Sequence, residues 1–143
     1  LLHAPDNIGQ KALEELVKEP VVKNALDVIG KTSIIIHSIG NAFEMANRRK
    51  SSKDILKVLE EKNAVCESFG SYFDENGSEI FKTSTIGMSF KDVDGIDNVF
   101  TIVGGKAKAD AVYSYLNTNP ANATLIIDEA ICKKIIKKVN KNF

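Results

Sequence analysis

The sequence contains 143 residues, of which 43% are hydrophobic and 27% are charged. This composition is typical of globular domains and excludes a disordered or fibrous protein, and the length allows one hydrophobic core. The 19 basic and 19 acidic side chains balance, so we expect no direct binding of nucleic acid, because DNA-binding domains usually carry a positive field. No apolar run reaches the roughly 18 residues that a membrane span needs, so a cytoplasmic protein without membrane contact is predicted.

The start of the chain and its cysteines give further expectations. The sequence opens without a starting Met, and Leu1–Pro5 does not resemble a signal peptide, so we interpret it as a piece of a longer protein. Cys66 and Cys132 are far apart, and neither has a Cys or His at metal-ligand spacing. We therefore predict two reduced, buried thiols, no metal site and no cofactor.

In chain order, the first part of the sequence predicts helices on either side of one buried strand. Helices are expected from about Asn7 to Glu19 and from Pro20 to Ile29, because the residue before a proline avoids helical geometry. The β-branched run from Thr32 to Ile39 is short and continuous, which is typical of a strand covered on both faces of a parallel sheet. Two more helices are expected over residues 41–49 and 52–62, where apolar residues recur at helical spacing.

A β-hairpin is predicted around residues 70–83. Two strand-like runs, 71–74 and 78–81, flank the pair Asn76-Gly77, which accepts the positive φ angles of a tight turn. These runs therefore predict a local antiparallel ribbon.

The rest of the sequence alternates strands with helices. Buried strands are expected over residues 98–103 and 123–127, each followed by a helix, from about Lys106 to Leu116 and from Asp128 to about Val139. This alternation predicts the α/β class, with a parallel sheet and crossover helices. The lysine pairs late in the last helix predict a solvated helix end, because cations complement the C-terminal dipole, and a nucleic-acid patch is the alternative.

Three loops follow the carboxyl ends of predicted strands, where open α/β sheets bind ligands. They are residues 37–41, 104–108 and 128–129. In the second loop, Gly104-Gly105 would let the backbone approach a ligand, and Lys106 and Lys108 oppose the helix dipole unless an anion compensates them. A phosphate site and a simple Gly-Gly turn both remain open, because the loop is neither a Walker loop nor a dinucleotide fingerprint.

Several charged residues elsewhere have two interpretations. Arg48-Arg49-Lys50 ends a predicted helix, where a cluster of cations needs no ligand. Glu67 lies between Cys66 and Phe69 in a segment suited to burial, so it is either a sugar contact or half of an internal salt bridge. His37 stands in an apolar strand without an acid, a Cys or a second His nearby in sequence, which favours a core histidine.

In combination, these segments resemble the sugar-binding domain of the SorC family of bacterial regulators. The matching runs, in order and spacing, are Glu67–Asp74, Asn76-Gly77, Ile86–Met88, Thr101–Lys108 and Ile127–Ala130. The likeness extends upstream through Gln10, Glu19-Pro20, Ile39-Gly40 and Met45–Arg49, and so covers nearly the whole chain. Each run is weak alone, but their ordered combination is specific.

The resemblance implies a Rossmann-like three-layer α/β/α fold, similar to sugar-phosphate isomerases and deaminases and used for sensing. Full-length members carry an N-terminal helix-turn-helix domain that binds operator DNA, and they act as dimers or tetramers. Members of the glycolytic branch are repressors that respond to fructose 1,6-bisphosphate and related phosphorylated sugars. We interpret residues 1–143 as the C-terminal part of a phosphosugar-binding effector domain, without the helix-turn-helix domain and the first part of the effector domain.

Positional matching carries the family's ligand contacts onto this sequence. The implied contacts are Arg48 and Lys108 for phosphate, Glu67 for the sugar, Gln10 as a further polar contact, Gly104 and Gly105 for the approach of a phosphate, and Asp128 as a weaker candidate. The sequence departs from the family at Ile127, where a Thr is usual. The family's first strand and its Gly-Gly-Thr-Thr type loop lie upstream of Leu1.

Two other functions are compatible with these residues. A sugar-phosphate isomerase or deaminase of the same fold would need an acid such as Glu67 or Asp128 to move a proton beside a carbonyl. A bare assembly module would have lost its ligand. The ligand-gated regulator requires no catalytic base, so the chain is not expected to be an enzyme.

Overall fold

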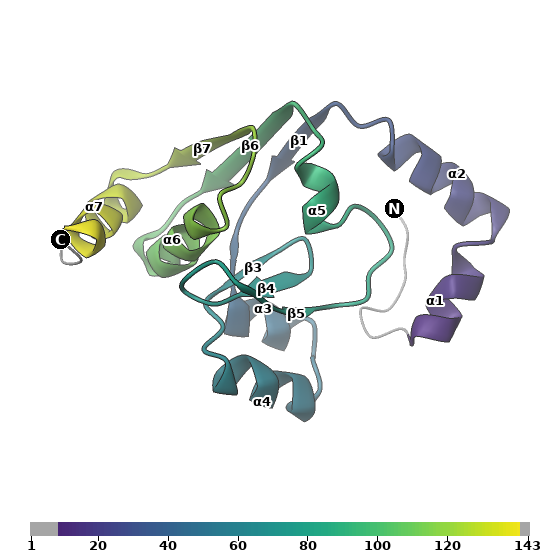
Figure 1. Ribbon diagram of the computed structural model, residues 1–143, viewed down its shortest axis with the longest axis horizontal. Coiled ribbons are helices and arrows are strands. Elements are labelled where there is room, and N and C mark those ends of the chain that lie inside the picture. The colour runs from purple at the N-terminus through teal and green to yellow at the C-terminus, as the bar shows by residue number, and fades with distance from the viewer. Residues whose placement is uncertain (1–8, 141–143) are drawn as a thin grey trace.

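The computed structural model describes residues 9–140, which form two sheets with helices around them (Figure 1). The strands are β1 (Ile34–His37), β2 (Gly40–Asn41), β3 (Cys66–Ser68), β4 (Ser71–Phe73), β5 (Glu79–Lys82), β6 (Asn98–Val103) and β7 (Ala123–Ile127). The helices are α1 (Gln10–Leu16), α2 (Pro20–Ile29), α3 (Ala42–Arg48), α4 (Lys53–Glu61), α5 (Phe90–Val93), α6 (Ala109–Asn117), α7 (Glu129–Val139) and the 3-10 turn η1 (Lys106–Lys108). Within residues 9–140, no helix is long and apolar enough to cross a membrane.

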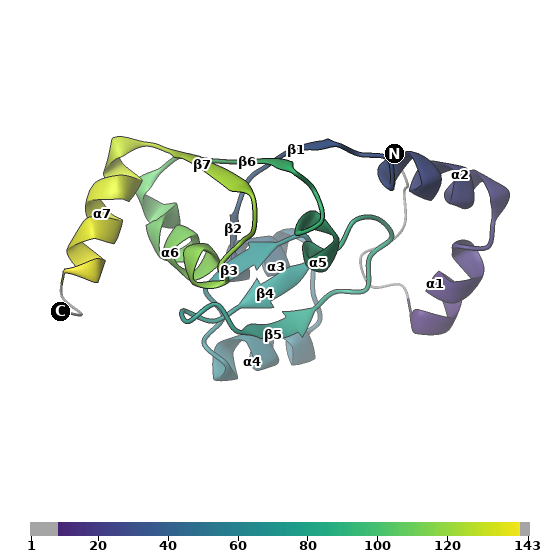
Figure 2. The ribbon, with the colours of Figure 1, turned by 45° about the horizontal axis from the view of Figure 1, so that its top comes forward.

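The parallel sheet joins segments that are far apart in the sequence, in the order β1-β6-β7. Ile36 of β1 lies opposite Phe100 of β6, and Thr101 of β6 lies opposite Leu125 of β7. Helix α6 connects β6 to β7 along one face of the sheet (Figures 1 and 2). The predicted α/β class, parallel sheet and crossover helix are therefore confirmed.

The two faces of the parallel sheet differ in burial. On one face, Ile35, Val99 and Val103 are buried in the core, where Val103 packs with residues of α6 and α7. On the other face, Ile36 is 71% exposed and Ile126 is 48% exposed. The prediction of strands covered on both faces is therefore wrong for residues 9–140. Successive side chains of a strand point to opposite faces, and here only one set points into the core.

The second sheet is antiparallel, in the order β2-β3-β4-β5. The hairpin predicted around residues 70–83 is present as β4 and β5, and its turn places Gly77 at a φ of 80°. Strands β2 and β3 were not predicted, because two or three residues are too few to show alternation. A second tight turn, Phe69-Gly70, joins β3 to β4 with φ angles of 50° and 79°.

Capping residues explain where the early helices begin. Helix α2 runs from Pro20 to Ile29, and α4 follows its cap Ser52, as predicted. Helix α3 follows Asn41, whose Oδ1 atom accepts a hydrogen bond from the Phe43 amide at 3.2 Å. The helix start predicted at Asn7 lies outside the described residues. Helix α1 spans Gln10–Leu16 and ends three residues before the predicted Glu19.

Two later helices depart from the prediction. The helix expected from Lys106 begins as the 3-10 turn η1 and becomes α6 only at Ala109. Helix α5 was not predicted, although its capping box is visible in the sequence. The Ser89 amide donates a hydrogen bond to the Asp92 carboxylate at 2.7 Å, which stabilises this short helix.

The two cysteines lie in different environments. Cys66 is buried as predicted, and this burial raises the pKa of its thiol. The prediction of a buried Cys132 is wrong, because this residue is exposed on α7 beside the fully buried Ile131. Both thiols are free.

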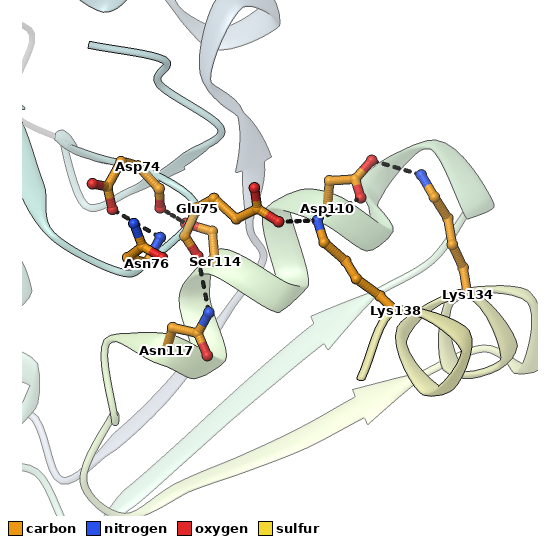
Figure 3. A network of polar contacts seen from close by, with 8 residues as sticks. All are labelled: Asp74, Glu75, Asn76, Asp110, Ser114, Asn117, Lys134 and Lys138. Atoms are coloured by element: carbon orange, nitrogen blue, oxygen red, sulfur yellow. Dashed lines mark hydrogen bonds and ion pairs between the residues drawn. The ribbon is translucent and has the colours of Figure 1, made fainter. Parts of the chain in front are cut away.

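The turn of the β4–β5 hairpin is docked on α6 and α7 by a polar network (Figure 3). The Ser114 hydroxyl donates to the Asp74 carbonyl oxygen at 2.5 Å, and the Asn117 side chain donates to the Glu75 carbonyl oxygen at 2.9 Å. Lys138 of α7 forms an ion pair with the Glu75 carboxylate at 2.5 Å. These contacts hold the antiparallel sheet against the helices of the parallel sheet.

Candidate functional site

The carboxyl ends of β1 and β6 meet at one edge of the parallel sheet. The chain leaves β1 towards Ile39 and Gly40, and it leaves β6 through Gly104 and Gly105. Lys108 joins the two loops, because its ammonium group donates a hydrogen bond to the Ile39 carbonyl oxygen at 2.9 Å. A cationic side chain is thus held at the edge where open α/β sheets bind ligands.

Gly40 brings a buried acid to the same edge. It lies opposite Glu67 in the β2–β3 ladder. A Cβ atom at Gly40 would overlap the Met45 side chain and lie 3.2 Å from Glu67 Oε2, so the close approach of these elements depends on a glycine. Lys108 and Glu67, which are far apart in the sequence, therefore both lie against the short segment of residues 39–40.

Glu67 takes part in an internal ion pair. Its side chain is almost fully buried, and its Oε1 atom accepts hydrogen bonds from Arg49 Nη1 at 3.0 Å and from the Gly70 amide at 2.8 Å. Arg49 also contacts the Tyr72 hydroxyl at 3.4 Å. Burial acts to lower the pKa of the Arg49 guanidinium, but the charge and hydrogen bonds of Glu67 and Tyr72 together outweigh burial and raise that pKa. Of the two interpretations of Glu67, the salt bridge is confirmed.

Asp128 connects the loop of residues 104–108 to the loop that precedes α7. Its Oδ2 atom accepts a hydrogen bond from the Gly105 amide at 2.5 Å, and its Oδ1 atom accepts one from the Ile131 amide at 2.8 Å. These amides favour the charged carboxylate and lower the pKa of Asp128, Gly105 making the largest contribution. Gly105 has a φ of 97°, and a Cβ atom there would meet nothing within 4 Å. The Gly104-Gly105 turn is thus fastened on one side and open on the other.

Two predicted contacts are exposed on helices. Arg48 is the last residue of α3 and is exposed. Gln10 is exposed on α1, where its side chain donates to Glu14 at 3.0 Å. Figures 1 and 2 show α1 at the opposite end of the molecule from α6 and α7. The structure therefore does not bring Gln10 to Lys108. Gln10 instead lines a pocket of about 310 Å³ with Leu13 and residues 82–85.

His37 lies behind the site in the core. Its Nε2 atom lies 2.7 Å from the Thr101 hydroxyl oxygen, which is 3.2 Å from the Tyr115 hydroxyl oxygen. Its ring packs against Phe69, with ring centres 4.7 Å apart. Burial lowers the pKa of His37 and favours the neutral ring. The prediction of a core histidine is confirmed in part: the ring packs on core residues, but His37 is half-buried and its buried Nδ1 atom has no hydrogen-bond partner within the described residues. Within residues 9–140, no three His, Cys, Asp or Glu side chains gather to hold a metal ion.

Comparison with known proteins decides the family. The model of a family of sugar-binding domains, named Sugar-bind, matches residues 1–137. The chain belongs to this family. This sugar-binding domain is 36% identical over 137 residues to the central glycolytic genes regulator of Bacillus subtilis, a match that covers 96% of the chain and 40% of that protein.

Solved structures extend the likeness. A SorC family transcriptional regulator from Enterococcus faecalis superposes with a TM-score of 0.86 and 39% sequence identity, over 94% of this chain and 55% of that one. The full-length sorbitol operon regulator SorC from Klebsiella pneumoniae is 14% identical and shares the fold, with a TM-score of 0.71 over 95% of this chain and 44% of that one. The predicted SorC relationship is therefore confirmed. The sugar-binding domain spans about half the length of these relatives.

One residue of the site was missed at the sequence level. Arg49 holds the Glu67 carboxylate of the sugar-binding domain, a contact for which the sequence had indicated no partner. The signal lies in helical spacing: Arg49 follows Met45 by four residues, so both side chains lie on one face of α3. Met45 contacts Gly40, and that face therefore points to β2 and β3.

Proposed function

We propose that this sugar-binding domain binds a phosphorylated sugar, such as fructose 1,6-bisphosphate or a related glycolytic intermediate. The observation that carries the proposal is the position of Lys108. Its ammonium group is fixed at the Ile39 carbonyl oxygen, 2.9 Å away, at the carboxyl edge of the parallel sheet. The open Gly104-Gly105 turn precedes it by three residues, so a phosphate could approach the backbone there and meet a cation.

The sugar itself would lie towards Glu67. A carboxylate has about four lone-pair sites, so Glu67 can accept hydrogen bonds from sugar hydroxyls while it is bound by Arg49 and the Gly70 amide. The ion pair with Arg49 compensates the buried charge of Glu67, which would destabilise the folded state if it were unpaired. Arg48 and Gln10 remain proposed contacts from the family resemblance. Their exposure leaves them available for a ligand or for another part of the protein.

The domain would act as the sensor of a cytoplasmic transcription regulator. We propose a repressor of glycolytic genes that binds operator DNA through a separate helix-turn-helix domain and assembles as a dimer or tetramer. The names of the Bacillus and Enterococcus relatives support this role. A ligand that binds one arrangement of the subunits more tightly than another would shift the population and change operator affinity.

An isomerase or deaminase is not favoured by the site. A general base must be able to accept a proton from the substrate. Glu67 is bound by a guanidinium group and an amide, and Asp128 is bound by two amides. Both carboxylates are thus held in the charged form by donors of the chain, which makes each a weak proton acceptor. Isomerase activity of the full-length protein on phosphorylated sugars, abolished by Glu67→Gln, would overturn the regulator proposal.

Calorimetry on the full-length regulator tests the effector. We expect fructose 1,6-bisphosphate to bind more tightly than fructose, and Lys108→Ala to weaken the bisphosphate at least tenfold. Lys57→Ala is the matched control, because Lys57 is an exposed lysine of α4 paired with Glu61. Equal, absent responses to both sugars would show an assembly module instead. Equal losses in the two lysine variants would remove Lys108 from the site.

A further inference from the structure

The two lysines of the Gly-Gly-Lys-Ala-Lys segment have different surroundings. Lys108 reaches the Ile39 carbonyl oxygen, whereas Lys106 lines a separate pocket of about 400 Å³ against α7. The other residues that line this pocket are Ala130, Lys133, Lys134 and Lys137. We propose that this pocket is a second anion site, which binds a small, multiply charged phosphate compound.

The pocket is built by one face of α7. Residues 130, 133, 134 and 137 recur at the three- and four-residue spacing of a helix face. The 3-10 turn η1 brings Lys106 to that face. The hydrogen bonds of Asp128 to Gly105 and to Ile131 fix the turn against the first turn of α7, so the walls of the pocket are held in place.

The charges that line the pocket are only partly balanced. Lys133 pairs with Glu129 at 2.5 Å on the exposed surface, and Lys134 pairs with Asp110 at 2.6 Å. Within the described range 9–140, the side chains of Lys106 and Lys137 form no hydrogen bond or ion pair with another residue. Two cations therefore face the pocket without a compensating carboxylate. An anion that binds there would relieve their repulsion.

The size of the pocket indicates the class of ligand. Small-molecule sites usually enclose about 300–1,000 Å³, and this pocket lies near the lower limit. Ala130 and the aliphatic stems of the lysines add an apolar wall. The two unbalanced cations match a ligand with two or more negative charges better than a singly charged one. A compact diphosphate fits both the volume and the charge.

This site shares no lining residue with the proposed effector site, although the hydrogen bond between Gly105 and Asp128 supports both. It uses Lys106 and Lys137, and none of the residues proposed to contact the phosphorylated sugar. The effector site could therefore fail its test while the second site passes, and the reverse is also true.

Calorimetry with inorganic pyrophosphate on the 143-residue chain tests the second site. We expect saturable binding that weakens at least tenfold in the double variant Lys106→Gln/Lys137→Gln. Lys57→Gln/Lys62→Gln removes the same charge from α4 and its C-cap residue and should leave the affinity within twofold, as should Lys108→Ala. Inorganic phosphate should bind more weakly than pyrophosphate, because it carries less charge.

Three outcomes would overturn the second site. Binding without saturation, or equal losses in the α4 control and the double variant, would indicate general attraction to surface charge. Loss of pyrophosphate binding in Lys108→Ala alone would place all anion binding at the effector site. Both lysine pairs lie on the surface, so their variants should fold like the wild type. Circular dichroism of each variant checks that a loss of binding is not caused by unfolding.

Discussion

Two glycine turns at opposite ends of α6 impose the same backbone requirement and have opposite surroundings. Gly77 has a φ of 80° and Gly105 a φ of 97°, which are angles that residues with side chains rarely adopt. A Cβ atom at Gly77 would lie 2.5 Å from the Thr118 nitrogen and 2.6 Å from the Asn117 carbonyl oxygen. A Cβ atom at Gly105 would meet nothing within 4 Å.

The Gly77 turn is used for packing, whereas the Gly105 turn is left open. The Gly77 turn is pressed onto the end of α6 and is held there by Ser114 and Asn117 (Figure 3). The Gly105 turn is fastened from one side by Asp128 and leaves its other side uncovered. A positive φ at a glycine therefore says that a turn exists, and the space around it says whether a ligand could approach.

The largest effect is expected from Gly77→Ala. The positive φ should cost about 1–2 kcal/mol, and the clash with the α6 backbone should add about 1–3 kcal/mol. We expect the free energy of unfolding to fall by about 3 kcal/mol in urea denaturation. Asn76→Ala, one residue earlier in the same turn, is the control and should cost less. A loss under about 1 kcal/mol would mean that the turn does not pack on α6 as described.

Gly105→Ala should have a smaller effect on stability. Only the backbone strain of about 1–2 kcal/mol is expected, because the Cβ atom finds open space. The same change should weaken binding of fructose 1,6-bisphosphate to the full-length regulator, since the methyl group narrows the approach to the backbone. Urea denaturation and calorimetry on one preparation measure both effects. Losses of stability equal to that of Gly77→Ala would remove the distinction between the two turns.

The parts of the fold that the sequence predicted are those with long local signals. The runs that became β6 and β7 have six and five residues and are rich in β-branched side chains, and Asn76-Gly77 marked the hairpin directly. Strands β2 and β3 have two and three residues and exist through their pairing partners. Their connection uses Phe69-Gly70, which is a weaker turn signal than Asn-Gly.

The site was predictable as a set of loops but not as a set of contacts. The rule that ligands collect at the carboxyl ends of parallel strands selected the loops of Gly105 and Asp128. Which of the two arginines reaches Glu67 depends on how α3 is rotated against β3, because the side chains of neighbouring helix residues point about 100° apart. That rotation is set by tertiary packing of Met45 on Gly40.

Lys138→Gln should have a modest effect and test how the hairpin turn is held. Lys138 pairs with Glu75 at 2.5 Å and with Asp110 at 3.3 Å, and its side chain is partly exposed. Such pairs contribute about 0.5–1 kcal/mol, so urea denaturation should show a loss in that range. Lys137→Gln is the matched neighbour and should cost less. A loss near that of Gly77→Ala would mean that charge, and not backbone packing, holds the turn on α6.

The smallest effect is expected from the Asp128 carboxylate, which holds the Gly105 turn, and it should appear only at acidic pH. The amides of Gly105 and Ile131 lower the pKa of Asp128 below its ordinary value of 3.8, so the unfolded chain binds this proton more readily than the folded one. Its contribution to stability is therefore present above about pH 4 and is lost as the pH falls through the lower, folded pKa. Asp128→Asn should reduce the fall in melting temperature between pH 5 and pH 2. It should do so by more than Asp97→Asn, in which an exposed loop carboxylate is changed. Equal pH profiles for wild type and Asp128→Asn would mean that the carboxylate does not hold the Gly105 turn, and the turn would then be open on both sides.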